Sequence, residues 1–252
     1  MNNLLAALMF FTRLPFWRIK QVPKDSFKHV VSYWSFCGWL TGGVMALVAW
    51  CGLSLPAEVA VVLALASRLL LTGALHEDGL ADFFDGFGGG RNREDTLRIM
   101  KDSHIGSYGV LGLVVYYLLA YSMLANMPHY RLLPAVLLCG DCWSKFVCSN
   151  IINLLPYART ESESKAKTVY SRMTAGEMLI SALGGVAPLS LLVVWGYGRF
   201  VLIGCLLSAI IFLLLTGLFR RRLGGYTGDC CGAVFLLAEL GFWLAFVLLP
   251  IY

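Results

Sequence analysis

Seven apolar runs, each close to the length that crosses a lipid bilayer, constrain the fold of this chain more than any other feature. A transmembrane helix needs roughly 20 predominantly apolar residues. Hydrophobic residues make up 58% of the 252 residues and charged residues only 14%, which exceeds what a soluble domain uses. The runs cover residues 31–51, 57–75, 107–126, 132–155, 177–195, 200–219 and 231–250. The sequence therefore predicts an all-α fold, a polytopic membrane helix bundle of about seven transmembrane helices, as one integral-membrane domain over residues 1–252.

The first apolar stretch, MNNLLAALMFFTRLPFW, is of a different kind. It has neither a basic n-region nor a small-residue cleavage site, so it is not expected to be a removed signal peptide. Its apolar part is also too short to cross a bilayer with certainty. This stretch is predicted to form an interfacial or re-entrant helix.

Basic residues are concentrated in alternate connections. Sixteen of the twenty Lys and Arg residues lie before the first run or in the connections after the second, fourth and sixth runs. Because cytoplasmic loops are enriched in Lys and Arg, the N-terminus and these connections are predicted to be cytoplasmic. The opposite connections are short, so we expect the function to lie on the cytoplasmic face. This pattern and the lipid bilayer account for the net charge of +5, and no nucleic-acid partner is expected.

The connection over residues 76–109 holds the densest polar chemistry. If Leu75 through Asp85 is helical, Asp78, Asp82 and Asp85 fall at i, i+4 and i+7 and share one face. Three carboxylates in a row repel one another, and a divalent cation would relieve that repulsion. The alternative is an acidic surface helix that pairs with nearby basic residues. The spacing favours the cation, and His76 and His104, which bracket the acidic run, are candidate ligands or proton carriers.

A second polar connection covers residues 220–230. Glycines such as Gly225 let backbone N–H groups approach an anion, and the start of the next helix offers further free N–H groups. Arg222 suits a helix C-terminus and lipid head groups as well as a phosphate. Asp229 is a candidate N-cap of the last helix, or else the completion of a metal site with the first acidic row.

Four charged residues fall in the interior of the apolar runs, where charge is costly and faces the bundle interior or a wet cavity. Asp141 and Lys145 are spaced at i, i+4, which favours an internal salt bridge as much as a functional site. Arg68 has no obvious local partner. Glu239 is the remaining acid in a run.

The blocks HEDGLADFFDGFGGG, IMKDSHIGSYG, YAR and RRLGGYTGD resemble the signature blocks of the cobalamin synthase family, in the family's usual order and over the whole chain. The chain departs from that pattern at Phe83-Phe84, at Cys230-Cys231, and in the polar TESESK run after YAR. The resemblance implies an adenosylcobinamide-GDP ribazoletransferase in the bacterial cytoplasmic (inner) membrane. Such an enzyme joins adenosylcobinamide-GDP to α-ribazole or α-ribazole 5′-phosphate, releases GMP and uses Mg²⁺, late in the assembly of the cobalamin nucleotide loop.

Joined to the resemblance, the residue pattern gives a hypothesis for the catalytic domain, with its active site in the connections 76–109 and 220–230. Metal binding is assigned to Asp78, Asp82 and Asp85, and catalytic roles to Glu77, Asp82 and His76. Substrate and phosphate binding is assigned to a larger set: Arg98, Lys101, Asp102, Ser103, His104, Gly88, Gly89, Arg159, Arg222, Gly225, Thr227 and Asp229. A homo-oligomer and pathway partners stay open.

Two other functions are compatible with part of this pattern. A CDP-alcohol phosphotransferase-like enzyme also sets aspartates at the membrane face, but here Asp82 stands where that family's pattern has Arg. A cation transporter would hold its binding groups near the bilayer midplane, whereas most acids of this chain crowd one cytoplasmic connection.

Overall fold

A computed structural model of the chain describes residues 1–160 and 169–248, and the regular elements in these ranges are helices. The one β pairing within these ranges is an isolated bridge between Tyr157 and Tyr226. The all-α prediction is therefore confirmed for the described residues. Residues 161–165 of the TESESK run and the end of the last predicted apolar run, 249–250, lie outside them.

All seven predicted apolar runs fall on helices. In chain order these are α2 (Trp34–Cys51), α3 (Ala57–Thr72), α6 (Ser107–Ala125), α7 (Leu133–Ser149) with α8 (Ile151–Leu154), α9 (Ala175–Val186) with α10 (Leu189–Leu192), α11 (Gly198–Leu223) and α12 (Gly228–Leu248). By length and composition, five helices of the described chain could cross a membrane, or up to six if a bent pair counts as one span. The protein is a polytopic helical membrane protein.

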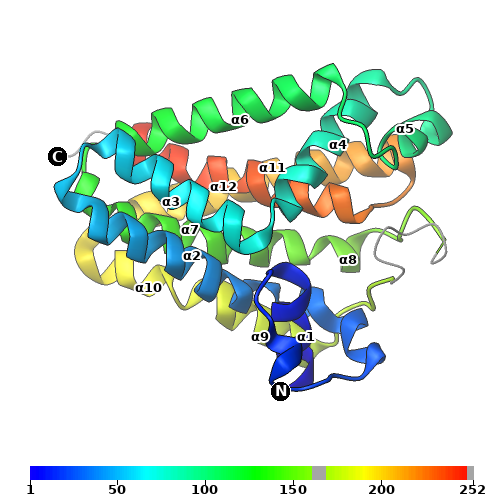
Figure 1. Cartoon of the computed structure of the whole chain (residues 1–252), viewed down its shortest axis with the longest axis horizontal. Helices are drawn as coiled ribbons and strands as arrows, with labels where there is room; N and C mark the ends of the chain where they lie inside the picture. The colour runs from blue at the N-terminus through cyan, green and yellow to red at the C-terminus, as the bar shows by residue number, and fades with distance from the viewer. Residues whose placement is uncertain (161–168, 249–252) are drawn as a thin grey trace.

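The number of spans is lower than seven because α9 to α11 are counted together as one continuous segment, Ala175–Leu223. Gly196 interrupts this segment with a φ of 89°, a left-handed conformation that glycine adopts without a steric penalty. Figure 1 shows the chain turning back between α10 and α11. The segment therefore contains two passes of opposite direction, which correspond to the separate runs 177–195 and 200–219.

The bent pair consists of α3 and α4 (Leu75–Gly89), whose axes differ by 92°. Gly73 and Ala74 between them both have positive φ, 66° and 60°. A left-handed glycine is a common end for a helix, but an alanine in this region is strained. The backbone N–H of Arg13 donates to the carbonyl of Leu71 at 2.8 Å, and the Arg13 side chain fills the space that a Cβ on Gly73 would need. The N-terminal segment thus packs directly against the bend.

Helices α7 and α12 form the centre of the bundle. In the most apolar stretch of each, 78% of the residues are buried, against 28% to 39% in the other spans. Helix α12 packs against α4, α7 and α11, and α7 packs against α2. Trp243 and Phe242 of α12 are fully buried. A helix that is apolar on all sides is expected in such a position.

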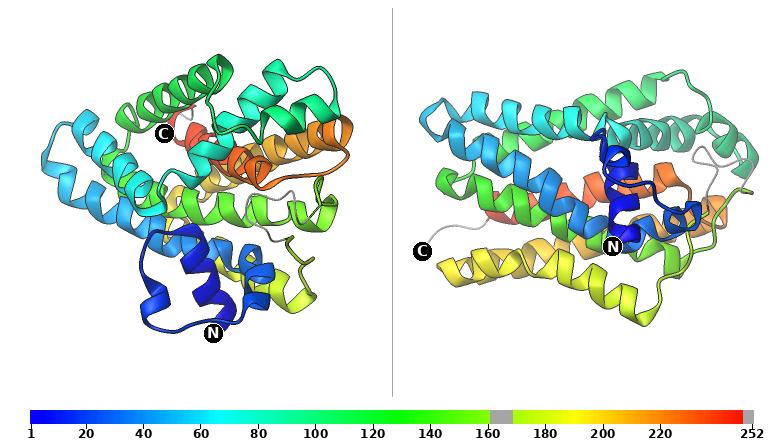
Figure 2. Two further views of the ribbon diagram at one scale, coloured as in Figure 1. Left: turned by 45° about the vertical axis from the view of Figure 1, so that its right-hand side comes forward. Right: turned by 60° about the horizontal axis from the view of Figure 1, so that its bottom comes forward.

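The polar connections gather at one end of the bundle. Figure 1 shows α5 (Arg93–Ile99), the end of α8 and the connection from α11 to α12 at this end, and the turns after α2 and α10 at the other. Helix α1 (Asn2–Phe11) lies across the long helices in Figure 2. Its ten residues reach only about 15 Å, half of a bilayer core. The predicted N-terminal helix is therefore present, and it is shorter than a bilayer core.

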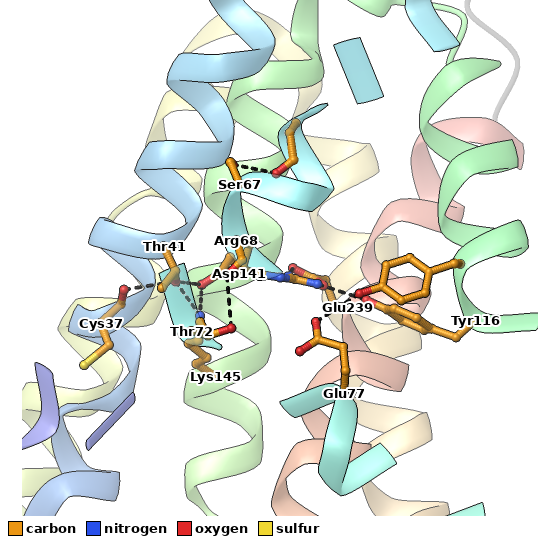
Figure 3. A network of polar contacts seen from close by, with 12 residues as sticks. Cys37, Thr41, Ser67, Arg68, Thr72, Glu77, Tyr116, Asp141, Lys145 and Glu239 are labelled. Atoms are coloured by element: carbon orange, nitrogen blue, oxygen red, sulfur yellow. Dashed lines mark hydrogen bonds and ion pairs between the residues drawn. The ribbon is translucent and has the colours of Figure 1, made fainter. Parts of the chain in front are cut away.

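A network of charged side chains lies inside the bundle, and Figure 3 shows its members pointing toward one another. Arg68 forms an ion pair with Glu239 at 2.6 Å and a longer one with Asp141 at 3.4 Å. Asp141 also pairs with Lys145 and accepts a hydrogen bond from the Thr41 hydroxyl at 2.8 Å. Arg68 therefore does have partners, but they come from α7 and α12 and not from its own helix.

The network contains two cations and two anions, all four of them at most 1% exposed. The second guanidinium nitrogen of Arg68, Nη2, donates to the Tyr116 hydroxyl of α6 at 3.0 Å. Charge balance and added hydrogen bonds are what make buried ions tolerable. The internal salt bridge expected from the spacing of Asp141 and Lys145 is present, and the network joins α2, α3, α6, α7 and α12.

Replacing Arg68 by methionine should destabilise the fold strongly, by about 3–5 kcal/mol, because Glu239 keeps its buried charge without its partner. The double variant Arg68→Met/Glu239→Leu should recover much of that loss. The measurement is the unfolding midpoint in mild detergent, with the exposed Arg199→Met as control. A double variant as unstable as Arg68→Met alone would contradict the pairing.

Candidate active site

A pocket lies at the polar end of the bundle, where α1, α4, α12 and the segment after α8 meet. Its polar lining includes His76 and Asp78 from α4, Arg159 from the segment after α8, and Asp229 from α12. Asp78 is exposed, whereas Asp229 is only 7% exposed. Two of the acids that the sequence singled out, one from each polar connection, therefore line one pocket.

Small residues bring α4 and α12 into direct contact. A Cβ on Gly79 would lie 3.1 Å from the Cα of Asp229, and a Cβ on Gly232 would lie 2.8 Å from the carbonyl oxygen of His76. Neither position accepts a larger side chain without separating the helices. These two glycines therefore fix how closely Asp78 and Asp229 approach.

Thr227, and not Asp229, caps α12. The Thr227 hydroxyl oxygen accepts a hydrogen bond from the backbone N–H of Cys230 at 3.3 Å, so the interpretation of Asp229 as the N-cap is wrong. Asp229 stands in the first turn, where a carboxylate is favoured by the helix dipole. It accepts a hydrogen bond from the Thr227 hydroxyl at 3.3 Å and lies 3.7 Å from Arg159 Nη1.

The segment after α8 is tied to the connection before α12 by backbone pairing. The N–H of Ala158 donates to Tyr226 at 2.8 Å, and the N–H of Tyr226 donates to Pro156 at 2.9 Å. Gly225 is required here, because a Cβ would collide with the carbonyl of Pro156. Arg93 joins the two segments to α5, since its guanidinium donates to Leu223 and Ala158 carbonyls at 2.7 and 2.8 Å.

A second pocket, which is basic, adjoins the first. Arg93, Arg98 and Lys101 of the α5 region line it, together with Tyr157 and Arg159, which also line the first pocket. Arg159 is held in place by a hydrogen bond from Nη2 to the carbonyl of Leu97 at 3.0 Å. The structure thus brings the predicted phosphate-binding residues Arg98, Lys101 and Arg159 to one pocket.

The predicted helical row of acids is present on α4, but its members differ in environment. Asp82 lies one turn after Asp78 and is 9% exposed. Asp85 accepts hydrogen bonds from the backbone N–H groups of Gly106 at 2.7 Å and Gly109 at 2.8 Å, so its two oxygens serve the N-terminus of α6. Among the described residues, no group of three or more His, Cys, Asp or Glu side chains is arranged to hold a metal ion. The three-carboxylate site is therefore not formed by the row alone.

Glu77 and His76 point to different surroundings. Glu77 is 4% exposed, faces α6, and accepts a long hydrogen bond from the Tyr117 hydroxyl at 3.4 Å. Figure 3 shows it beside the Arg68 network, and it does not line the pocket of Asp78. The His76 ring is buried, 5.4 Å from the ring of Trp34 and 4.9 Å from that of Phe235.

Several predicted residues line neither pocket. Asp102 accepts a hydrogen bond from the backbone N–H of His104 at 3.0 Å and contacts its ring nitrogen at 2.8 Å, and these hydrogen bonds lower the pKa of Asp102 below its usual value. Arg222 donates to the carbonyl of Gly90 at 2.8 Å, at the end of α4. The remaining members of this group are Ser103, Gly88, Gly89, Gly225 and Thr227, together with Glu77, Asp82 and Asp85 of α4.

Sequence reasoning missed Arg93 and the aromatic residues of the first pocket. In the sequence Arg93 is one of several basic residues of its connection. Nothing local indicates that its guanidinium donates to carbonyls of two distant segments. Tyr157 was visible as the first residue of YAR, and nothing local indicated that α1 would supply Phe10 and Phe11.

Replacing Asp85 by alanine should lower the free energy of unfolding by about 0.5–2 kcal/mol, the usual cost of losing a helix cap. The Gly106 and Gly109 amides should exchange with solvent faster, as hydrogen-exchange mass spectrometry of the peptide containing them can measure. The exposed Asp25→Ala, in the N-terminal segment, is the matched control. Unchanged exchange in Asp85→Ala would show that the two amides do not depend on this carboxylate.

Comparison with known proteins gives matches over nearly the whole chain. The family model described as cobalamin-5-phosphate synthase matches residues 3–247. A protein of Shewanella frigidimarina (strain NCIMB 400) named adenosylcobinamide-GDP ribazoletransferase is 39% identical over 245 residues, which cover 95% of this chain and 92% of that protein. A protein of Shewanella sp. (strain W3-18-1) with the same name is 37% identical, covering 97% of this chain and 93% of its own length. No solved structure matches the chain.

Proposed function

The chain belongs to the cobalamin-5-phosphate synthase family, and from this membership we propose that it joins adenosylcobinamide-GDP to α-ribazole or α-ribazole 5′-phosphate. A ribose hydroxyl of the acceptor attacks the phosphorus on the cobinamide side of the diphosphate. The bond from that phosphorus to the GMP oxygen breaks, GMP leaves, and the hydroxyl proton passes to a base. The product is adenosylcobalamin or its 5′-phosphate.

The observation that carries the proposal is the pair of adjoining pockets with opposite charge. One is lined by Asp78 and Asp229, the other by Arg98 and Lys101, and Arg159 lines both. A transfer between two large substrates requires one place for the attacking hydroxyl and one for the anionic donor. Basic side chains suit the diphosphate and the departing GMP, and carboxylates suit the attacking hydroxyl.

We propose that Mg²⁺ takes part, held by Asp78 and Asp229 with Asp82 one turn away. Mg²⁺ is commonly bound by one or two protein carboxylates together with substrate phosphates. The two carboxylates that line one pocket suit this mode. When bound, Mg²⁺ would neutralise charge on the diphosphate.

The residues of the chain then have separate roles. Arg98 and Lys101 hold the phosphates, and Arg159 orients Asp229 and reaches the bound diphosphate. Asp78, exposed in the pocket, would hold Mg²⁺ beside the attacking hydroxyl. Glu77 lies on the α6 side of α4, where the Tyr117 hydroxyl donates to it, so we assign it a structural role, and Asp85 positions α6 instead of binding metal.

The replacement Asp82→Asn should abolish turnover. It removes the negative charge one turn after Asp78 on α4 and keeps the size of the side chain. GMP release from adenosylcobinamide-GDP and α-ribazole, with and without Mg²⁺, is the measurement. Asp25→Asn, an exposed acid of the N-terminal segment paired with Lys28, is the control and should leave the rate unchanged. Membrane insertion should be normal in both variants, and wild-type rates in Asp82→Asn would refute the assignment.

We also propose that the protein lies in the cytoplasmic membrane of a bacterial cell. Its polar end and its N-terminus are on the cytoplasmic side. The support is that the connections rich in Lys and Arg share this end of the bundle, as the positive-inside rule requires. Both substrates are polar, and a cytoplasmic site gives them access without crossing the membrane.

Cysteine labelling tests this orientation. In a Cys51→Ser background, Ser103→Cys at the polar end should react with a membrane-impermeant maleimide only after the cells are opened. Ser54→Cys at the other end should react in intact cells. Ser103 and Ser54 are both exposed, so they form a matched pair. The reverse labelling pattern would invert the topology.

A further inference from the structure

Five phenylalanine, tryptophan and tyrosine rings are among the residues that line the first pocket, and no step above uses them. Phe10 and Phe11 come from α1, Trp34 from the start of α2, and Tyr157 and Tyr170 from the two sides of the segment between α8 and α9. Phe11 stacks on Trp34 at 4.9 Å with 9° between the rings, and Phe10 meets Tyr170 edge to face at 6.1 Å. A wall of this kind suits a flat, largely apolar ligand.

Two polar atoms in this lining lack hydrogen-bond partners. Trp34 Nε1 and His76 Nε2 have none among the described residues, although the two side chains are only 1% and 2% exposed. Buried polar groups are nearly always satisfied, so each exception needs an explanation. A ligand that offers one or two polar atoms to an otherwise apolar slot would provide it.

The two substrates of the proposed reaction carry different bases. The base of α-ribazole is a dimethylbenzimidazole, a flat ring system with two methyl groups, one unsubstituted ring nitrogen that accepts hydrogen bonds, and no N–H donor. Guanine has polar groups along most of its edge, namely a carbonyl, an amino group, a ring N–H and ring acceptors. Burying guanine in this pocket would leave several of them unpaired, which is costly.

We propose that the aromatic lining of the first pocket binds the benzimidazole base of the acceptor, so that Phe10 and Trp34 are specificity-determining residues. The indole N–H of Trp34 is the donor that matches the single ring nitrogen. The acceptor's ribose then lies toward Asp78 and Asp229 in the same pocket, while the guanosine diphosphate portion of the donor occupies the basic pocket. This inference rests on the proposed function and adds to it which substrate each pocket takes.

Helix α1 thereby acquires a role. It is too short to span the membrane, and it packs across the bundle where Arg13 contacts the α3–α4 bend. Its two phenylalanines form one side of the acceptor pocket. The N-terminal helix is therefore part of the binding site as well as an interfacial element.

The test measures KM for each substrate separately in the purified full-length protein, with GMP release as the readout. Phe10→Ala removes one ring of the wall, and Trp34→Phe keeps a ring but removes the N–H. Each should raise KM for α-ribazole about tenfold and leave KM for adenosylcobinamide-GDP within about twofold of wild type. Phe200→Ala, a partly buried phenylalanine at the opposite end of the bundle, is the matched control and should change neither constant.

A second comparison uses an acceptor with α-linked adenine in place of dimethylbenzimidazole. The wild type should have a higher kcat/KM for α-ribazole than for the adenine acceptor. Phe10→Ala and Trp34→Phe should lower the ratio of the two kcat/KM values, and Phe200→Ala should leave that ratio unchanged. Equal rises in both KM values, a rise for the donor alone, or an unchanged preference would overturn the subsite assignment. Absence of GMP release in the wild type would instead refute the proposed function, so the two failures are distinguishable.

Discussion

The break between α3 and α4 is the constraint on which the rest of the site depends. Two consecutive residues with positive φ, Gly73 and Ala74, turn the chain by 92°. Without that turn, α3 would continue along the bundle and carry the acids of α4 away from α12. With it, the helix that bears Asp78 lies at the end of the bundle and meets the start of α12. The strained Ala74 is held because Arg13 packs on the bend from the N-terminal segment.

Helix α12 carries both of the contacts that fix this arrangement. Its Glu239 pairs with Arg68 of α3 deep in the bundle, and its first turns contact Gly79 and His76 of α4. Asp229 and Glu239 are ten residues apart on α12, which is about 15 Å of helix, whereas the bend at Gly73 and Ala74 separates Arg68 from the start of α4. The buried ion pair and the glycine contacts therefore hold the same two stretches of chain at two levels. This explains how charges that never touch substrate can determine the geometry of the pocket.

The features predicted correctly from the sequence are those encoded by neighbouring residues. The apolar runs predicted the long helices. The spacing of Asp78 and Asp82 predicted that both acids lie on one face of a helix. The features that were missed depend on contacts between distant segments. The partners of Arg68 are 73 and 171 positions away, and Asp85 caps a helix that begins more than twenty residues later. The choice of Thr227 over Asp229 as the cap depends on where α12 begins, which composition alone does not define.

The charged side chains of the interior and those of the two pockets differ in their surroundings. The first set stabilises the bundle, and the second set lines the candidate active site. In the interior, Arg68, Lys145, Asp141 and Glu239 pair with one another in equal numbers, so the group has no net charge with which to attract a passing ion. At the end of the bundle, Asp78 and Asp229 line one pocket and Arg98 and Lys101 line the next, with Arg159 lining both, so each pocket presents charged side chains to a bound molecule. This arrangement suits two substrates, one that brings the attacking hydroxyl and one that brings the phosphates, which is the requirement of a phosphotransfer and not of a transport path.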